Sequence, residues 1–199
     1  MNVEPLAVVV IGTLISITCL HFIYDHVCGF SRRTANDVFP FLVKLDMEAL
    51  YGTFHPDPEK RFRESLSPRE FKRIQWKRIH LAIHYCNQIV NNAHVFLTWT
   101  RYERKQTWLA DYPGIKKTAH DLRIACLQSS LSAFVIKSRL RWWLVRMALV
   151  PFAPPPSFAT LLKHGSWDMI TFYERVKALA EIFSLSYGDE YHEKLMQAL

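Results

Sequence analysis

The stretch Asp111-Tyr112-Pro113-Gly114 (DYPG) separates the two longest helical patterns of this 199-residue chain. Adjacent proline and glycine residues are a strong turn signal. Two long helices joined by a short turn pack side by side in opposite directions. The sequence therefore predicts an antiparallel hairpin over residues 67–150, with helices each about 50 Å long.

The first helix of this hairpin starts at Ser67. Ser67 can cap the free backbone N–H groups, Pro68 suits the first helical position, and Glu70 completes a capping box. The helical pattern then continues past Arg101, to about Ala110. One face collects apolar residues at helical spacing, which predicts a core face. Its members are Phe71, Ile79, Ala82, Ile83, Cys86, Ile89, Val90, Ala93 and Leu97.

The second helix is predicted from about Lys116 to Val150, where Pro151 ends it. Large apolar residues recur along it at nearly heptad spacing, and we expect them to form its core stripe. They are Ile124, Leu127, Leu131, Phe134, Val135, Trp142, Val145 and Leu149.

Further helices are predicted after a proline-rich break at 151–156. Ser157 can cap a short helix, Ser166 can cap a longer one that runs to about Leu185, and a last short helix ends at Leu199. No strand-like alternation is found, so the chain is predicted to be all-α. We expect residues 157–199 to pack on the hairpin and complete a helical bundle domain over 67–199.

Residues 1–25 are predicted to form a membrane anchor. The twenty residues 5–24 carry no formal charge, and as a helix they would span about 30 Å, the hydrocarbon thickness of a bilayer. A buried core helix and a cleaved signal peptide are the alternatives. The acidic Glu4 and the absence of a small-residue cleavage site argue against the signal peptide. Residues 26–66 are interpreted as a connector that holds a short amphipathic helix from about Val38 to Tyr51.

The charge distribution predicts the orientation of this anchor. All 25 Lys and Arg residues follow it, the net charge is +7, and Arg32 and Arg33 lie close behind it. Basic residues favour the cytoplasmic side. The prediction is a single-pass protein with its N-terminus outside and its helical domain in the cytoplasm, where the four cysteines, which form no CxxC pair, would stay reduced.

Two stretches of the hairpin combine basic and aromatic residues. The first contributes Arg69, Lys72, Arg73, Trp76 and Lys77. Such a pattern suits a helix at the level of anionic lipid headgroups, an acidic partner protein, or nucleic acid, while a solvated face is the plainer interpretation.

The second stretch contributes Arg139, Arg141, Trp142 and Trp143. It is too short and too charged to span a bilayer, but it has the character of an interfacial helix. The interpretation favoured by the sequence alone is that Trp142 and Leu149 belong to the core while the arginines face water.

His80 and His84 are four residues apart, so their rings can share a helix face and could bind a transition metal. The segment lacks the glutamate of an HExxH motif, and the sequence offers no third ligand nearby. A buried polar seam or a solvated face is the alternative interpretation of this polar side, and no cofactor is predicted.

These patterns favour a non-catalytic interaction or scaffold module, anchored in a membrane, that binds a partner protein or an anionic membrane surface. No nucleophile, phosphate-loop or dinucleotide motif is present. The alternative hypotheses are a metal-dependent enzyme that uses His80 and His84, and a membrane-tethered nucleic-acid binder.

Overall fold

The computed structural model describes residues 38–103, 113–150, 156–162 and 166–199. Every regular element in these ranges is a helix, which confirms the all-α prediction for the described part of the chain. The elements, in chain order, are η2 (Phe39–Phe41), α2 (Met47–Phe54), α3 (Asp57–Ser65), α4 (Pro68–Glu103), α5 (Pro113–Leu149), α6 (Phe158–Leu162), α7 (Ser166–Ser184), η4 (Leu185–Tyr187) and α8 (Asp189–Ala198).

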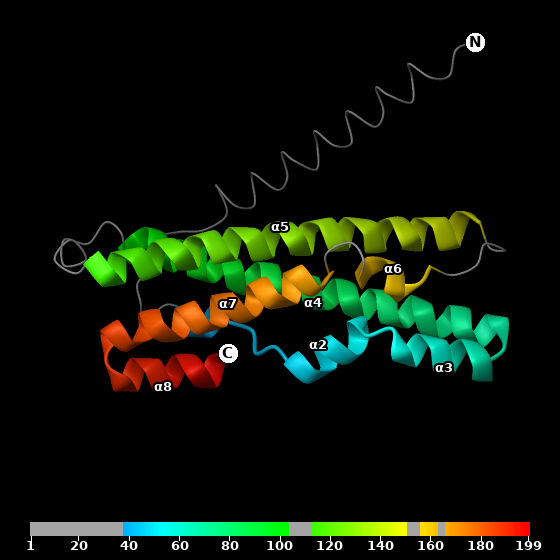
Figure 1. Ribbon diagram of the computed structural model, residues 1–199, viewed down its shortest axis with the longest axis horizontal. Helices are drawn as coiled ribbons and strands as arrows, with labels where there is room; N and C mark the ends of the chain where they lie inside the picture. Colours follow the sequence, from blue (N-terminus) through cyan, green and yellow to red (C-terminus); the bar gives the residue numbers. More distant parts are fainter. Residues whose placement is uncertain (1–37, 104–112, 151–155, 163–165) are drawn as a thin grey trace, which may run out of the picture.

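The long helices α4 and α5 form the predicted antiparallel pair (Figure 1). The start of α4 meets the end of α5, where Lys72 Nζ donates a hydrogen bond to the Met147 carbonyl at 3.2 Å. The capping box is also present: the Ser67 backbone N–H donates to the Glu70 carboxylate, and the Glu70 N–H donates to the Ser67 hydroxyl. These bonds satisfy amide groups that the first helical turn leaves unpaired.

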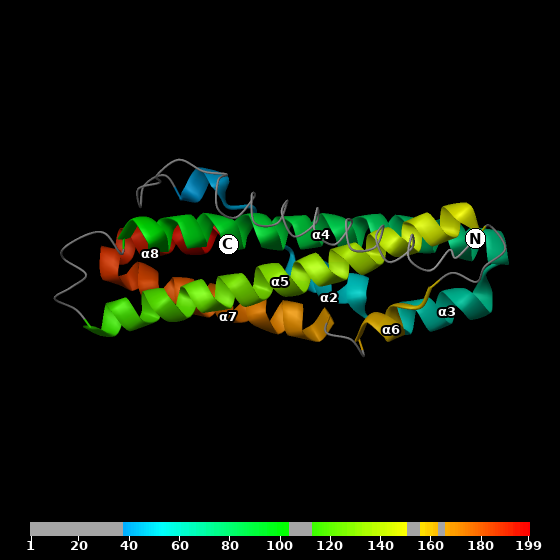
Figure 2. The ribbon, with the colours of Figure 1, turned by 90° about the horizontal axis from the view of Figure 1, so that it is seen from above.

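Helix α5 packs against both α4 and α7. Seen from above, one end of α5 lies over α7 and the other end lies over α4 (Figure 2). The face that α5 turns toward these helices carries mostly small side chains, which let helix axes approach closely. Its buried residues are Ala119, Leu122, Ala125, Cys126, Ser129, Ser130, Ala133, Ile136, Leu140 and Met147.

The predicted core stripe of α5 was wrong. Of the eight residues, only Phe134 is half-buried, and the other seven are exposed; Leu131 is 56% exposed and Leu149 is 75% exposed. The predicted core stripe of α4, by contrast, is buried or half-buried throughout. Helix α5 therefore has two apolar faces, and the one with the larger side chains points away from the core.

Residues 38–66 pack on the bundle, and Val38, Leu50 and Phe54 are fully buried. The helix predicted from Val38 to Tyr51 is wrong, because α2 begins only at Met47, with Asp46 as its N-cap. Asn92 of α4 explains the difference. Its side chain accepts the Val43 N–H at 2.9 Å and donates to the Val43 carbonyl at 2.8 Å, which holds that backbone out of a helix.

The C-terminal helices close the bundle. Helix α7 turns Ile170, Tyr173, Val176, Ala180 and Phe183 inward. Helix α8 follows Gly188, whose φ of +96° is a conformation that favours glycine.

The predicted anchor, residues 1–25, lies outside the described residues. Among the helices that the structure describes, none combines the length and hydrophobicity needed to cross a bilayer.

Replacing Asn92 with Ala should lower the free energy of unfolding by about 2–4 kcal/mol. Asn92 is fully buried, and it also donates to the Tyr173 hydroxyl at 2.7 Å, so its loss leaves several buried groups unpaired. Urea unfolding of the full chain in mild detergent, followed by circular dichroism, measures the change. Asn87→Ala is the matched control, because Asn87 is exposed on the same helix and its loss should change stability by less than about 0.5 kcal/mol.

A second pair of variants tests the orientation of α5. Leu140→Ala removes a fully buried side chain and should cost about 2–5 kcal/mol. Leu131→Ala removes an exposed one and should cost less than about 0.5 kcal/mol. If Leu131→Ala instead lowered the free energy of unfolding more than Leu140→Ala in the same assay, the large residues of α5 would face the core. That result would contradict this fold.

Candidate functional site

The antiparallel hairpin brings the two predicted basic stretches to one end of the molecule. On α4, Arg69, Arg73, Trp76 and Lys77 are exposed and Lys72 is half-buried beside Met147. On the facing end of α5, Arg139, Arg141 and Trp142 are exposed. We call these residues together the basic end of the hairpin.

The three tryptophans in or next to the basic end differ in exposure: Trp76 and Trp142 are exposed, whereas Trp143 is half-buried. Trp142 is 65% exposed and Trp76 is 38% exposed, with the Trp76 ring 5.5 Å from the His80 ring. Trp143 instead is half-buried and packs edge-on against Phe158 at 5.8 Å. The expectation that Trp142 and Leu149 belong to the core is therefore wrong, and Trp143 takes the packing role.

Charge is unevenly distributed among the helices. Helix α5 carries seven Lys and Arg residues and one acidic residue, Asp121. Helices α7 and α8 together carry six acidic and three basic residues. Because α5 lies on the opposite side of the bundle from α8 (Figure 1), the described domain has a basic side and a more acidic side. Such a separation of charge orients a protein at a charged surface.

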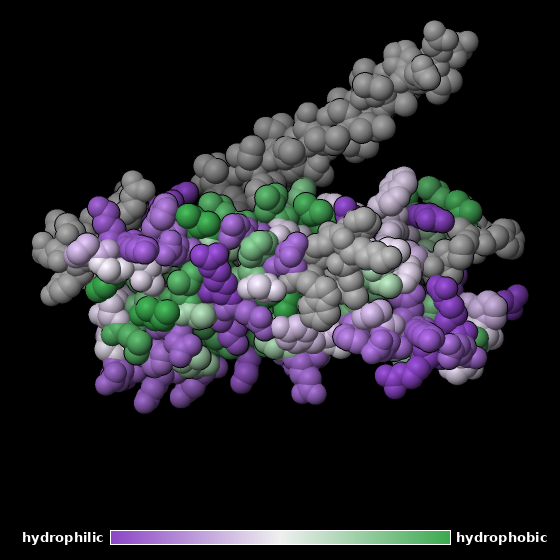
Figure 3. Space-filling view, in the orientation of Figure 1, coloured by the Kyte–Doolittle hydropathy of each residue, from purple (hydrophilic) through white to green (hydrophobic). Residues whose placement is uncertain are grey.

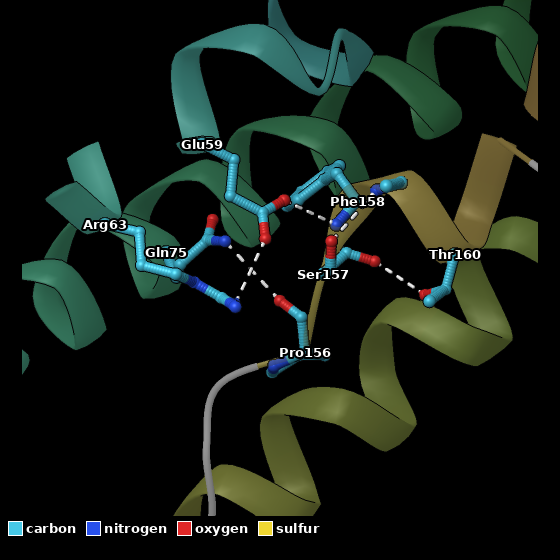
Figure 4. Close-up of polar contacts among 8 residues, drawn as sticks. Glu59, Arg63, Gln75, Pro156, Ser157, Phe158 and Thr160 are labelled. Carbon is cyan, nitrogen blue, oxygen red and sulfur yellow. Dashed lines mark hydrogen bonds and ion pairs between the residues drawn. The ribbon is translucent and has the colours of Figure 1, made fainter. Parts of the chain in front are cut away.

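A buried polar junction joins α3, α4 and α6, and the sequence analysis did not identify it. Glu59 is 5% exposed; its carboxylate accepts the Phe158 N–H at 2.7 Å and lies 3.5 Å from Arg63 Nη2 (Figure 4). Gln75 Nε2 donates to the Pro156 carbonyl at 3.4 Å. No pattern in the sequence marks Glu59 as buried, because its neighbours Lys60 and Arg61 are charged and exposed.

Arg78 of α4 also contacts this junction, through the ring of Phe158. Its Nε donates to the Thr53 carbonyl at 2.7 Å, its Nη2 donates to the His55 carbonyl, and its guanidinium lies 4.2 Å from the centre of the Phe158 ring. Burial lowers the pKa of Arg78, and the charge of Glu59 partly offsets that effect. A hollow of about 280 Å³ beside the junction is lined partly by Glu59 and Arg63. The Glu59 carboxylate already binds the backbone of α6, so we assign it a structural role.

The predicted metal-binding pair gains no further ligand from the described residues. His80 and His84 are both exposed on α4, and the part of the chain that the structure describes holds no group of three or more His, Cys, Asp or Glu residues that could bind a metal. Farther along the same polar side, Asn91 donates to the Phe41 carbonyl at 2.9 Å and His94 is buried. That side is therefore a solvated face in one part and a buried seam in another.

An aromatic cluster with one buried carboxylate closes the other end of the bundle. The Trp99 ring lies 4.8 Å from Phe183, 5.5 Å from Tyr187 and 5.8 Å from Tyr191. Burial raises the pKa of Glu103 in this cluster, although hydrogen bonds with Tyr187 and Trp99 act in the opposite direction. The rings fill the space around Trp99, which is fully buried, so this cluster serves packing.

Comparisons with known proteins give no assignment. No protein-family model matches the chain, and no similar curated protein or solved structure was found. Function must therefore be inferred from the surfaces described above.

Glu103 should make stability depend on pH. Because its pKa is raised in the folded state, the folded protein binds this proton more tightly than the unfolded chain. The free energy of unfolding contributed by Glu103 is therefore greatest below its ordinary pKa of 4.5 and is lost as the pH rises through and above that value. Glu103→Gln should gain stability relative to the parent chain between pH 4 and pH 7 in urea unfolding. If the free energies of unfolding of the two proteins differed by the same amount at pH 4 and at pH 7, the raised pKa of Glu103 would be contradicted.

Proposed function

We propose that this chain is a non-catalytic interaction module, anchored in a membrane by residues 5–24, whose helical domain binds an anionic membrane surface through the basic end of the hairpin. The N-terminus lies outside and the domain lies in the cytoplasm, beside the negatively charged leaflet. The supporting observation is that two separate stretches of Lys and Arg meet at this end, with Trp76 and Trp142 exposed among them.

The physical chemistry of the cytoplasmic leaflet suits this surface. Each Lys or Arg residue near an anionic leaflet contributes about 1 kcal/mol of attraction, and exposed tryptophan rings are favoured at headgroup level. A domain tethered close to the surface needs only a modest attraction, because the anchor keeps its local concentration high.

Nucleic acid is the other polyanion that basic residues bind. The large apolar side chains exposed along α5 favour a lipid surface instead, since phosphate backbones offer them no apolar partner. No described observation favours the metal-dependent enzyme over this proposal.

Docking of the domain can be measured in the full chain reconstituted into vesicles. A donor fluorophore on Ala148→Cys, near the basic end, reports energy transfer to headgroup-labelled lipid. Transfer should be stronger when about a third of the lipid is phosphatidylserine than in phosphatidylcholine alone. Removing three charges by Arg69→Gln, Arg73→Gln and Lys77→Gln should weaken docking by about 3 kcal/mol, a factor of about one hundred.

The matched control removes the same charge from the opposite side, with Arg175→Gln, Lys177→Gln and Lys194→Gln on α7 and α8. This variant should dock as the parent chain does. Equal transfer in anionic and neutral vesicles, or equal loss in both triple variants, would refute binding through the basic end.

A further inference from the structure

The solvent-facing side of α5 is an apolar stripe. We use this name for the seven exposed residues Ile124, Leu127, Leu131, Val135, Trp142, Val145 and Leu149. They recur at intervals of three, four or seven residues, so they lie in one line along the helix. From the first to the last, the stripe extends about 38 Å. Figure 3 shows hydrophobic patches, with hydrophilic side chains between them, at the upper edge of the molecule, where α5 lies.

Basic residues border the apolar stripe on both sides. At 100° per residue, Arg123 and Arg141 fall on one flank of the stripe, while Arg139 and Arg146 fall on the other. Trp142, an amphipathic ring, lies within the stripe itself. An apolar line between two basic flanks is the pattern of a helix that lies in the plane of an anionic membrane interface.

The shape of this side also favours a flat partner. Helix α5 lies over the first part of α4, while the last part of α4 runs beside it at the same level (Figures 1 and 2). A partner helix binds best in a hydrophobic groove, whereas a single line of apolar side chains along one helix can sink into a planar interface. A second copy of this chain fits poorly, because facing stripes would bring together two helices that each carry seven basic residues and one acidic residue.

We propose that α5 lies in the plane of an anionic bilayer, with the apolar stripe inserted at the boundary between headgroups and acyl chains. The flanking arginines bind lipid phosphates, and the more acidic α7 and α8 face the aqueous side. This inference rests on the proposed function and deepens it: the basic end supplies the attraction, and the apolar stripe makes the domain a second, in-plane contact with the membrane.

Insertion can be tested with an environment-sensitive NBD probe on Leu131→Cys in the full chain. Cys19 and Cys28 are replaced by Ser. Cys86 and Cys126 are left in place, because both are fully buried and burial raises the pKa of Cys86 to about 12. In vesicles with about a third phosphatidylserine, the emission should shift to the blue. Spin labels at the top of the acyl chains should quench roughly half of it or more, since an interfacial helix sits about 5–10 Å deep. The shift should persist at high salt, because it comes from apolar contact.

Glu181→Cys is the matched control, since this exposed position lies on α7 and should keep water-like, unquenched emission. Leu127→Cys, also on the stripe, should behave as Leu131→Cys does. Water-like emission at both stripe positions would overturn the insertion. A blue shift without quenching by lipid would also overturn it, because a second copy or residues 5–24 would then cover the stripe. If energy transfer from the fluorophore on Ala148→Cys is still stronger with anionic lipid in either case, binding through the basic end stands and only the insertion fails.

Discussion

The structure depends on the close packing of one face of α5 against α4 and α7 together. Ala125, Ser129 and Ala133 on this face are small enough for two helices to approach α5 at once. Larger side chains there would push the helices apart, since a filled interior does not accept added volume without strain. Once the small residues are buried, the large apolar ones on the other side of α5 must point outward. The exposed apolar stripe thus follows directly from how the core is packed.

The shorter elements are held to this core by buried polar side chains that bind backbone groups. Asn92 binds the extended backbone at Val43, and Arg78 binds carbonyls at the end of α2. Glu59 binds the first amide of α6. Buried backbone N–H and C=O groups that have no partner within a helix need a hydrogen bond from elsewhere, and these side chains supply it. Together these side chains attach the short elements to the long helices.

The sequence predicted those parts of the fold that depend on local signals. Ser67 and Glu70 marked the start of α4, and the nine residues predicted for its apolar face are buried or half-buried. Val95, Phe96 and Trp99, on other sides of α4, are buried as well and were not predicted. The orientation of α5 could not be predicted, because periodicity favours the bulkier of two apolar faces and cannot show that a neighbouring helix needs small residues. The break before α2 depends on Asn92, which is 49 residues from Val43. Both basic stretches were identified from sequence, and the predicted antiparallel pairing explains why they meet, whereas the buried roles of Glu59 and Arg78 arise only from tertiary contacts.

The double-faced character of α5 also bears on the order in which the protein is made. Synthesis proceeds from the N-terminus, so α4 and α5 are both complete before α7 exists. Helix α7 supplies the second neighbour that only the small-residue face accommodates. A helix made after α5 therefore supplies the second neighbour that favours turning the small-residue face inward and the large apolar residues outward. A chain that stopped before Ser166 would lack the residues that make this choice.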